Sequence, residues 1–212
     1  IVFKLRSRLF KPNISSLDYG GIASFYDATS DACDNSAKAV GWSSEFNQTL
    51  RFDVMDYLVD FDEQTILDMG CGDGALHAYC TGKGIQMNYH GVDISANMIE
   101  RAKQRCPGGK FTQSNFMDMP VEASVVVFSG SLSMAMPCQK MDFLRAILTK
   151  INRQMCQHIV FNLLSDGAPK QDPLFWYFSP SEVLGMCLTL SPYVTLHHGY
   201  LPHDFTVHIQ NQ

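Results

Sequence analysis

The sequence predicts an α/β fold: one domain built on a mostly parallel β-sheet with helices on both faces. Apolar segments of strand type alternate with segments of helix type from residue 45 onwards. The last two strand segments are separated only by residues 201–204, which is too short for a parallel crossover, so they form an antiparallel hairpin. A chain of 212 residues, 46% of them hydrophobic, is long enough for one substantial core. We therefore expect a single mixed sheet.

Seven segments are predicted to be strands from their apolar or β-branched composition. The first is a short apolar run, and the fourth is strongly β-branched, as is typical of a central strand. The predicted strands are residues 65–69, 87–92, 110–113, 124–129, 158–163, 193–200 and 205–210.

Five segments are predicted to be helices. Ser43 or Ser44 is suited to cap the first helix, because a serine hydroxyl accepts a free backbone N–H of the first turn. The second helix follows directly after three glycines. The predicted helices are residues 45–59, 75–82, 96–106, 140–154 and 181–188.

Three glycines, Gly70, Gly72 and Gly74, connect the first strand to the second helix. Because glycine has no Cβ, such a turn lets a ligand approach the main chain closely. It also presents backbone N–H groups at a helix N-terminus, where anionic or polar groups bind. The segment is therefore predicted to be a nucleotide-type binding turn.

Asp93 ends the second strand, 23 residues after Gly70. Its carboxylate suits a ribose diol, because it accepts hydrogen bonds from both hydroxyls. Gly70, Gly72 and Ala75 also satisfy the dinucleotide pattern G-x-G-x-x-G/A. On these residues alone, a nicotinamide or flavin cofactor remains open.

Two longer motifs favour another cofactor. Residues 68–74 have the form D-x-G-x-G-x-G, and residues 92–98 have the form hydrophobic-D-hydrophobic-S-x-x-M. In both motifs the chain resembles the class I S-adenosylmethionine-dependent methyltransferases, and the match extends from Tyr26 to Ser131. The resemblance implies a Rossmann-like seven-stranded sheet with one antiparallel strand in a C-terminal β-hairpin. It also implies S-adenosylmethionine as cofactor and S-adenosylhomocysteine as product.

The resemblance indicates further cofactor residues. Asn115 stands in a segment where the family usually has Gly-Asp, Ser129 falls at the family's fourth motif, and Tyr26 matches a segment that folds over the cofactor. Arg51 is a candidate partner of the methionine carboxylate through charge-assisted hydrogen bonds, with a surface arginine as the alternative. The candidate cofactor residues are Tyr26, Arg51, Asp68, Gly70, Cys71, Gly72, Gly74, Asp93, Ile94, Met98, Asn115, Phe116 and Ser129.

The loop between the last two strands offers candidates for catalysis. Ligands of open α/β sheets bind at the carboxyl ends of the parallel strands, and this loop lies there if the sixth strand is parallel. His203, or less favourably Tyr200, is then a candidate base for a hydroxyl or amine acceptor. Asp204 becomes a candidate substrate residue; the alternative is a simple turn.

Residues 164–180 form a long connection after the fifth strand. Loops of this length in a compact domain are often lids or binding loops, and consecutive aromatic rings suit an apolar or planar substrate. The alternative is that the rings pin the loop to the core. The aromatic substrate candidates are Phe175, Trp176 and Tyr177. Met134, Met136 and Met141, after the fourth strand, suit either packing or an acceptor pocket.

Composition argues against several classes of partner. A net charge of −5 provides no basic field for nucleic acid, and no apolar run of 18 residues predicts a membrane span. The seven cysteines are scattered without a C-x-x-C pair, which predicts reduced thiols and a cytoplasmic location. His197 and His198 are adjacent in a strand and point to opposite faces, so no metal site is expected.

We expect residues 1–44 to form an N-terminal segment that serves as a lid, and residues 45–212 to form the methyltransferase core domain. Residues 1–11 lack the apolar region of a secretory signal. The expected reaction is in-line methyl transfer to a small-molecule acceptor, because residues 129–132 lack the proline-containing element of enzymes that methylate amide or amino nitrogens. The alternatives are a catalytically silent cofactor-binding module and an NAD-dependent oxidoreductase. The sequence sets neither the acceptor nor the oligomeric state.

Overall fold

The computed structural model describes residue 24, residues 45–154 and residues 156–211. The predicted lid over residues 1–44 lies outside the described residues apart from Ser24, and so does the cofactor candidate Tyr26. Both therefore stay predictions.

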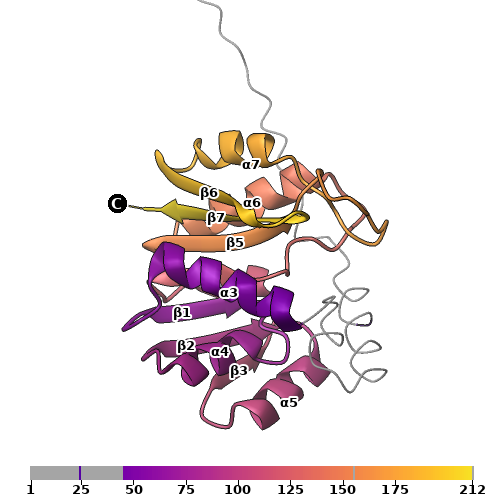
Figure 1. Ribbon diagram of the computed structural model, residues 1–212. Coiled ribbons are helices and arrows are strands. Elements are labelled where there is room, and N and C mark those ends of the chain that lie inside the picture. Colours follow the sequence, from indigo (N-terminus) through magenta and orange to yellow (C-terminus); the bar gives the residue numbers. More distant parts are fainter. Residues whose placement is uncertain (1–23, 25–44, 155, 212) are drawn as a thin grey trace, which may run out of the picture.

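Seven strands form one sheet in the order β3-β2-β1-β4-β5-β7-β6 (Figure 1). Strands β1 to β5 are parallel, and β7 runs antiparallel to both of its neighbours, β5 and β6. The strands are β1 (Thr65–Met69), β2 (Asn88–Asp93), β3 (Lys110–Gln113), β4 (Val125–Phe128), β5 (His158–Leu164), β6 (Tyr193–Leu201) and β7 (Asp204–Gln210). The expected mostly parallel sheet with a reversed strand in a C-terminal hairpin is confirmed.

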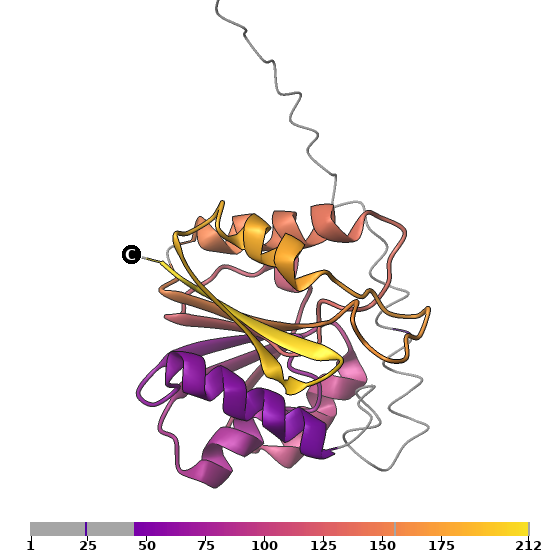
Figure 2. The ribbon, with the colours of Figure 1, turned by 45° about the horizontal axis from the view of Figure 1, so that its top comes forward.

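Helices cover both faces of the sheet (Figure 2). One face is covered by α3 (Glu45–Val59) and α4 (Ala75–Lys83), the other by α6 (Lys140–Asn152) and α7 (Pro180–Cys187). Helix α5 (Ala96–Arg105) packs against β2 and β3. A short 3-10 helix, η2 (Phe116–Asp118), follows β3 and was not predicted. The predicted helices and strands agree with these bounds to within two residues at each end.

The central strand β4 shows why this sequence needs two helical layers. All four of its residues are buried. Val125 and Val127 pack with α3 and α4, whereas Val126 and Phe128 pack with α6 and α7. Alternate side chains of a strand point to opposite faces, so a continuous apolar run requires an apolar layer on each side.

Strand β7 differs from β4 because only one of its faces is apolar. Phe205, Val207 and Ile209 belong to the core formed with α6 and α7. Asp204, Thr206 and His208 alternate with them and are also buried. A row of buried polar groups is stable only when each group finds a partner, so this face of β7 must supply hydrogen bonds.

His208 finds its partner in His158 of β5. Nε2 of His208 lies 3.0 Å from Nδ1 of His158, so one nitrogen donates and the other accepts. Burial and, to a smaller extent, the neighbouring His158 lower the pKa of His208 to about 4. The pair is therefore held in its neutral form.

This pair predicts a pH-dependent stability. Between pH 4 and pH 6.5 the unfolded chain binds a proton at position 208 that the folded protein excludes, so the free energy of unfolding rises with pH across that window. We expect His208→Asn to flatten the rise by roughly 2 kcal/mol, as measured by urea unfolding at pH 4.5 and pH 7.5. An unchanged pH slope in the variant would contradict the assignment.

Within the described ranges, no helix is both long enough and apolar enough to cross a membrane. The six cysteines of these ranges are free thiols, and five of them are buried. The same part of the chain contains no cluster of three His, Cys, Asp or Glu residues placed to hold a metal ion.

Candidate cofactor and active site

The turn between β1 and α4 has a backbone that favours glycine. Gly70, Gly72 and Gly74 have φ angles of 83°, 54° and 79°, all in the left-handed region. Residues with a Cβ are strained there, whereas glycine is not. Gly74 is the N-cap of α4, so the turn ends where the helix begins.

A second loop packs directly on this turn. A Cβ built on Gly70 would lie only 2.3 Å from the Cβ of Ser131, which follows β4. The hydroxyl of Ser131 donates a 2.7 Å hydrogen bond to the carbonyl oxygen of Met69. The glycine at position 70 is therefore required both by its backbone angle and by the close approach of the second loop.

Asp93 is fixed at the carboxyl end of β2. Its Oδ2 accepts a 2.8 Å hydrogen bond from the backbone N–H of Gly72, and its Oδ1 accepts one of 2.9 Å from the backbone N–H of Ser95. These bonds connect the glycine turn to the start of α5. A carboxylate offers about four lone-pair positions, so this group suits the hydroxyl donors of a ligand.

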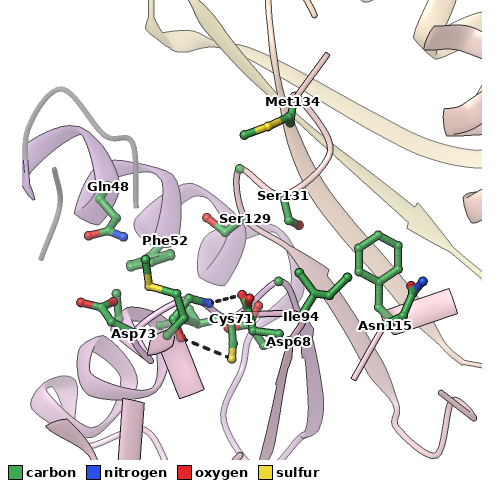
Figure 3. A pocket seen from close by; sticks show the side chains of 18 of the residues that line it. Gln48, Phe52, Asp68, Cys71, Asp73, Ile94, Asn115, Ser129, Ser131 and Met134 are labelled. Atoms are coloured by element: carbon green, nitrogen blue, oxygen red, sulfur yellow. Dashed lines mark hydrogen bonds between the residues drawn. The ribbon is translucent and has the colours of Figure 1, made fainter. Parts of the chain in front are cut away.

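These loops surround a pocket at the carboxyl edge of the parallel strands (Figure 3). Gln48 and Phe52 lie on α3 at one side, Asn115 lies at the opposite side, and Met134 lies on the chain after β4. The lining residues are Gln48, Phe52, Asp68, Gly70, Cys71, Gly72, Asp73, Ala75, Leu76, Asp93, Ile94, Met98, Asn115, Phe116, Ser129, Gly130, Ser131, Met134, Met136 and Phe143.

Asn115 and Phe116 form the end of the pocket near β3. The side-chain oxygen of Asn115 accepts a 2.9 Å hydrogen bond from the backbone N–H of Met117 and caps η2. The ring of Phe116 packs edge-on against Phe128, with 5.7 Å between ring centroids. The two side chains are thus held at the wall by the 3-10 turn and by the core.

Two buried carboxylates of the glycine motif belong to the residues that line the pocket, and each has one oxygen without a hydrogen-bond partner. Tyr89 donates a 2.6 Å hydrogen bond to Oδ2 of Asp68, and Arg105 pairs with Oδ2 of Asp73 at 2.9 Å. Neither Oδ1 has a hydrogen-bond partner among the described residues. Buried carboxylate oxygens of this kind favour a ligand that carries positive charge or N–H donors.

The pKa values of both groups reflect their burial. Burial raises the pKa of Asp68 to about 7; the hydrogen bond from Tyr89 opposes the shift and the charge of Asp93 adds to it. Burial also raises the pKa of Asp73, although Arg105 acts in the opposite direction. A cation placed beside these oxygens would lower both pKa values and would itself be stabilised.

Comparison with known proteins shows the family to which this chain belongs. Residues 66–154 match the family described as "Methyltransferase domain". Rv1506c of Mycobacterium tuberculosis, named as a methyltransferase, is 30% identical over 156 residues, which are 69% of this chain and 92% of that protein. The chain is a class I S-adenosylmethionine-dependent methyltransferase. Trans-aconitate 2-methyltransferase of Rhodopseudomonas palustris is 31% identical over 77 residues, which are 36% of this chain and 30% of that enzyme.

Solved structures share the methyltransferase fold at low sequence identity. Magnesium protoporphyrin IX methyltransferase from Synechocystis, solved with bound S-adenosylmethionine, gives a TM-score of 0.67 at 13% identity, covering 93% of this chain and 99% of that one. A methyltransferase from Archaeoglobus fulgidus gives 0.62 at 16% identity, covering 82% and 97%. At this level of identity, the likeness concerns the fold.

The residues of the pocket fit S-adenosylmethionine, the cofactor of this family. The glycine turn leaves room for a ligand against the main chain, and Asp93 is held as an acceptor for ribose hydroxyls. The unpartnered carboxylate oxygens of Asp68 and Asp73, in the lining of the pocket, suit the positive charges of the ligand. The pocket of the methyltransferase therefore supplies hydrogen-bond acceptors that match both the sugar and the cationic part of the cofactor.

Asp68 provides a test of this electrostatic interpretation in the methyltransferase. The folded protein retains a proton on Asp68 up to about pH 7, whereas the unfolded chain loses it near pH 3.8. The group therefore lowers the free energy of unfolding as pH rises through that window. We expect Asp68→Asn to raise this free energy at pH 8 by on the order of 2 kcal/mol and to have little effect at pH 4. Thermal unfolding at the two pH values measures the difference, and equal effects at both would contradict it.

The sequence-predicted cofactor residues mostly gather around the pocket. Ten of them line it: Asp68, Gly70, Cys71, Gly72, Asp93, Ile94, Met98, Asn115, Phe116 and Ser129. Gly74 caps α4 instead, and Tyr26 lies outside the described residues. The structure brings these ten together, and their contacts with the cofactor remain a proposal.

Arg51 does not lie among the residues that surround the pocket. Its side chain is buried in the methyltransferase and does not line the pocket. Both Nε and Nη2 lie 2.5 Å from Oδ2 of Asp204, so the guanidinium neutralises a carboxylate of its own chain. The structure thus places Arg51 in an ion pair and not in the lining of the pocket. Asp204, the predicted substrate residue, is fully buried in the same pair and does not line the pocket either.

The catalytic candidates Tyr200 and His203 also lie outside the pocket lining. The hydroxyl of Tyr200 donates a 2.7 Å hydrogen bond to Oδ1 of Asp204, and burial raises its pKa above the ordinary value. His203 is at the hairpin turn, where its carbonyl oxygen accepts from the backbone N–H of Ser165. The loop does reach the expected edge of the sheet, but it faces Arg51 rather than the pocket.

Two of the three aromatic substrate candidates, Phe175 and Trp176, contact residues that line the pocket. Phe175 pairs with Met134 through a backbone bridge, and the ring of Trp176 packs against Phe143 with 5.5 Å between centroids. Tyr177 accepts a hydrogen bond at its hydroxyl from the backbone N–H of Asp172. These three side chains do not line the pocket. Trp176 packs against the core, as the alternative for this loop expects, and the substrate roles of all three residues stay predictions.

Sequence reasoning missed several pocket residues. Gln48 and Phe52 are four residues apart on α3, which places them on one face of that helix. Of the methionines suited to an acceptor pocket, Met134 and Met136 line it, whereas Met141 does not. The spacing on α3 was the signal available for the first pair.

Proposed function

We propose that this methyltransferase acts on an uncharged small molecule with an apolar body. The observation that carries the proposal is the wall formed by Met134, Met136 and Phe143 beside the glycine turn. Among the described lining residues there is no lysine, arginine or histidine, and the charged groups are carboxylates. A neutral apolar acceptor suits this surface.

An anionic acceptor would meet an unfavourable environment. Its carboxylate would lose hydration and would find Asp68, Asp73 and Asp93 instead of a cation. Methionine side chains adapt to apolar ligands of different shape because the thioether chain is flexible and polarisable. The pocket thus supports selection by charge more strongly than selection by shape.

The proposed mechanism depends mainly on placement. When bound, S-adenosylmethionine supplies a methyl group activated by its sulfonium. The glycine turn and Asp93 would hold its sugar, and the carboxylates of Asp68 and Asp73 would lie beside its cationic part. The apolar wall would exclude water and orient the small-molecule acceptor toward the methyl group. Neither His203 nor Tyr200 has a role in this proposal.

One relative suggests an acceptor that a test should include. The Rhodopseudomonas enzyme is named for trans-aconitate, and the match spans 30% of that enzyme. Trans-aconitate, an anionic acceptor, is therefore the competing hypothesis. A cytoplasmic location, predicted from free thiols, and the lid over residues 1–44 also remain proposals.

The experiment measures methyl transfer from radiolabelled S-adenosylmethionine to matched acceptors. Each pair has one apolar skeleton that carries either a carboxylic acid or the corresponding alcohol, and trans-aconitate is added as a separate acceptor. We expect transfer to members of the neutral series and none to their acids. Transfer to trans-aconitate or to the acids alone would overturn the proposed charge preference. Cofactor binding without transfer across the panel would instead favour a catalytically silent module.

A further inference from the structure

A buried polar network connects the C-terminal hairpin to the pocket. Arg51 on α3 pairs with Asp204 at the start of β7. Asn162 on β5 donates from Nδ2 to both carboxylate oxygens of Asp204, at 3.0 and 3.2 Å. Its Oδ1 accepts a 2.8 Å hydrogen bond from the backbone N–H of Gly130. Arg51, Asp204 and Asn162 are at most 1% exposed, so water does not substitute for any of these partners.

Gly130 is the point where this network meets the pocket. Its φ angle of 76° belongs to the left-handed region, and the flanking residues Ser129 and Ser131 both line the pocket. Ser131 also packs on Gly70 and bonds to the carbonyl oxygen of Met69. The orientation of one peptide group therefore affects the wall of the pocket and its contact with the glycine turn.

The hydrogen bonds of this network have a fixed donor-to-acceptor direction, which apolar side chains could not reproduce. The guanidinium and the amide of Asn162 both donate to Asp204, which leaves the amide oxygen of Asn162 to accept from the loop. The amide is thus held in one orientation by the carboxylate. Replacing such groups by apolar ones can preserve stability, but it leaves the Gly130 N–H without an acceptor.

We propose that Arg51, Asp204 and Asn162 are positioning residues that hold the loop at residues 129–131 against the glycine turn. The C-terminal hairpin thereby sets the affinity of the methyltransferase for its cofactor without touching it. This gives a role to a hairpin whose residues do not line the pocket. The proposal rests on the pocket being the cofactor site, and it does not depend on the identity of the acceptor.

The test compares cofactor affinity with stability. The dissociation constant of S-adenosylhomocysteine is measured by calorimetry well below the unfolding temperature of each variant. We expect Asn162→Ala to raise this constant about tenfold, equivalent to about 1.4 kcal/mol. The control is Val207→Ala, because Val207 is buried on the opposite face of β7 and contacts the apolar core. This control is expected to lower stability and leave the constant unchanged.

A swapped pair tests the hydrogen-bond direction. In Asn162→Asp the new carboxylate faces Asp204, so affinity falls. Adding Asp204→Asn restores a donor toward position 162 and an acceptor toward Arg51, and it is expected to recover most of the affinity. If Asn162→Ala does not fold, Tyr200→Phe removes one donor to Asp204 and should raise the dissociation constant about threefold, equivalent to about 0.7 kcal/mol.

The outcomes separate two kinds of failure. If the wild-type protein does not bind S-adenosylhomocysteine, the assignment of the cofactor site fails. If it binds and Asn162→Ala binds equally well, the positioning role fails. Equal weakening by Val207→Ala, or no recovery in the swapped pair, would also overturn the positioning role, because the effect would then follow stability alone.

Discussion

Replacing Gly70 by alanine is expected to abolish cofactor binding and to destabilise the methyltransferase by on the order of 3 kcal/mol. The new Cβ would lie 2.3 Å from the Cβ of Ser131, and the backbone angle of 83° is unfavourable for alanine. Relief requires the turn and the loop after β4 to move apart, which opens the wall of the pocket. Urea unfolding gives the stability change, and calorimetry with S-adenosylhomocysteine gives the loss of binding.

Gly82→Ala is the matched control for this change. Gly82 lies within α4, and a Cβ built there meets no atom within 4 Å. Alanine favours a helix over glycine by roughly 0.5–1 kcal/mol, so the control is expected to be neutral or slightly stabilising and to bind normally. Normal binding by Gly70→Ala would show that the two loops separate without disturbing the site.

Replacing Arg51 by methionine is expected to cost about 3–5 kcal/mol of folding free energy. The change leaves the fully buried carboxylate of Asp204 without its cation, and burying an unpaired charge is strongly unfavourable. Asp204→Leu added to Arg51→Met removes the charge and should recover a large part of the stability. Chemical unfolding of the single and double variants measures both steps.

The exposed ion pair between Lys83 and Asp53 supplies a comparison. Its side chains are 48% and 41% exposed, so Lys83→Met is expected to cost less than about 1 kcal/mol. Similar losses for Arg51→Met and Lys83→Met would mean that water reaches Asp204. No recovery in the double variant would show that an unpaired charge on Asp204 is not the main loss, because Asn162 and Tyr200 also donate to this carboxylate.

The elements of the sheet were predictable because each depends on a local pattern. The β-branched run of β4 and the short connection of the C-terminal hairpin determine strand type without knowledge of distant contacts. The glycine turn was predictable for the same reason, since its backbone angles follow from residues that are adjacent in the sequence. The residues of the loop around Ser131 could not be placed in this way, because their position depends on how that loop packs.

Arg51 shows where local reasoning fails. A cationic side chain beside a cofactor strand suits a carboxylate ligand, and nothing nearby in the sequence indicates another partner. Its partner is separated from it by 153 positions and is brought to it by the insertion of β7 beside β5. The aromatic run at residues 175–177 is similar: its composition predicts contact with apolar surface, but not whether that surface is the ligand or the back of the pocket wall.

The sheet order carries a consequence for biosynthesis. Strand β7 lies between β5 and β6, although it follows both of them along the chain. While a ribosome is still making β7, β6 lacks the strand with which it pairs, and Arg51 has no counter-ion from Asp204. Nascent chains that stop before Asp204 should therefore fail to retain the cofactor. Cofactor binding should appear in a single step once β7 has left the exit tunnel.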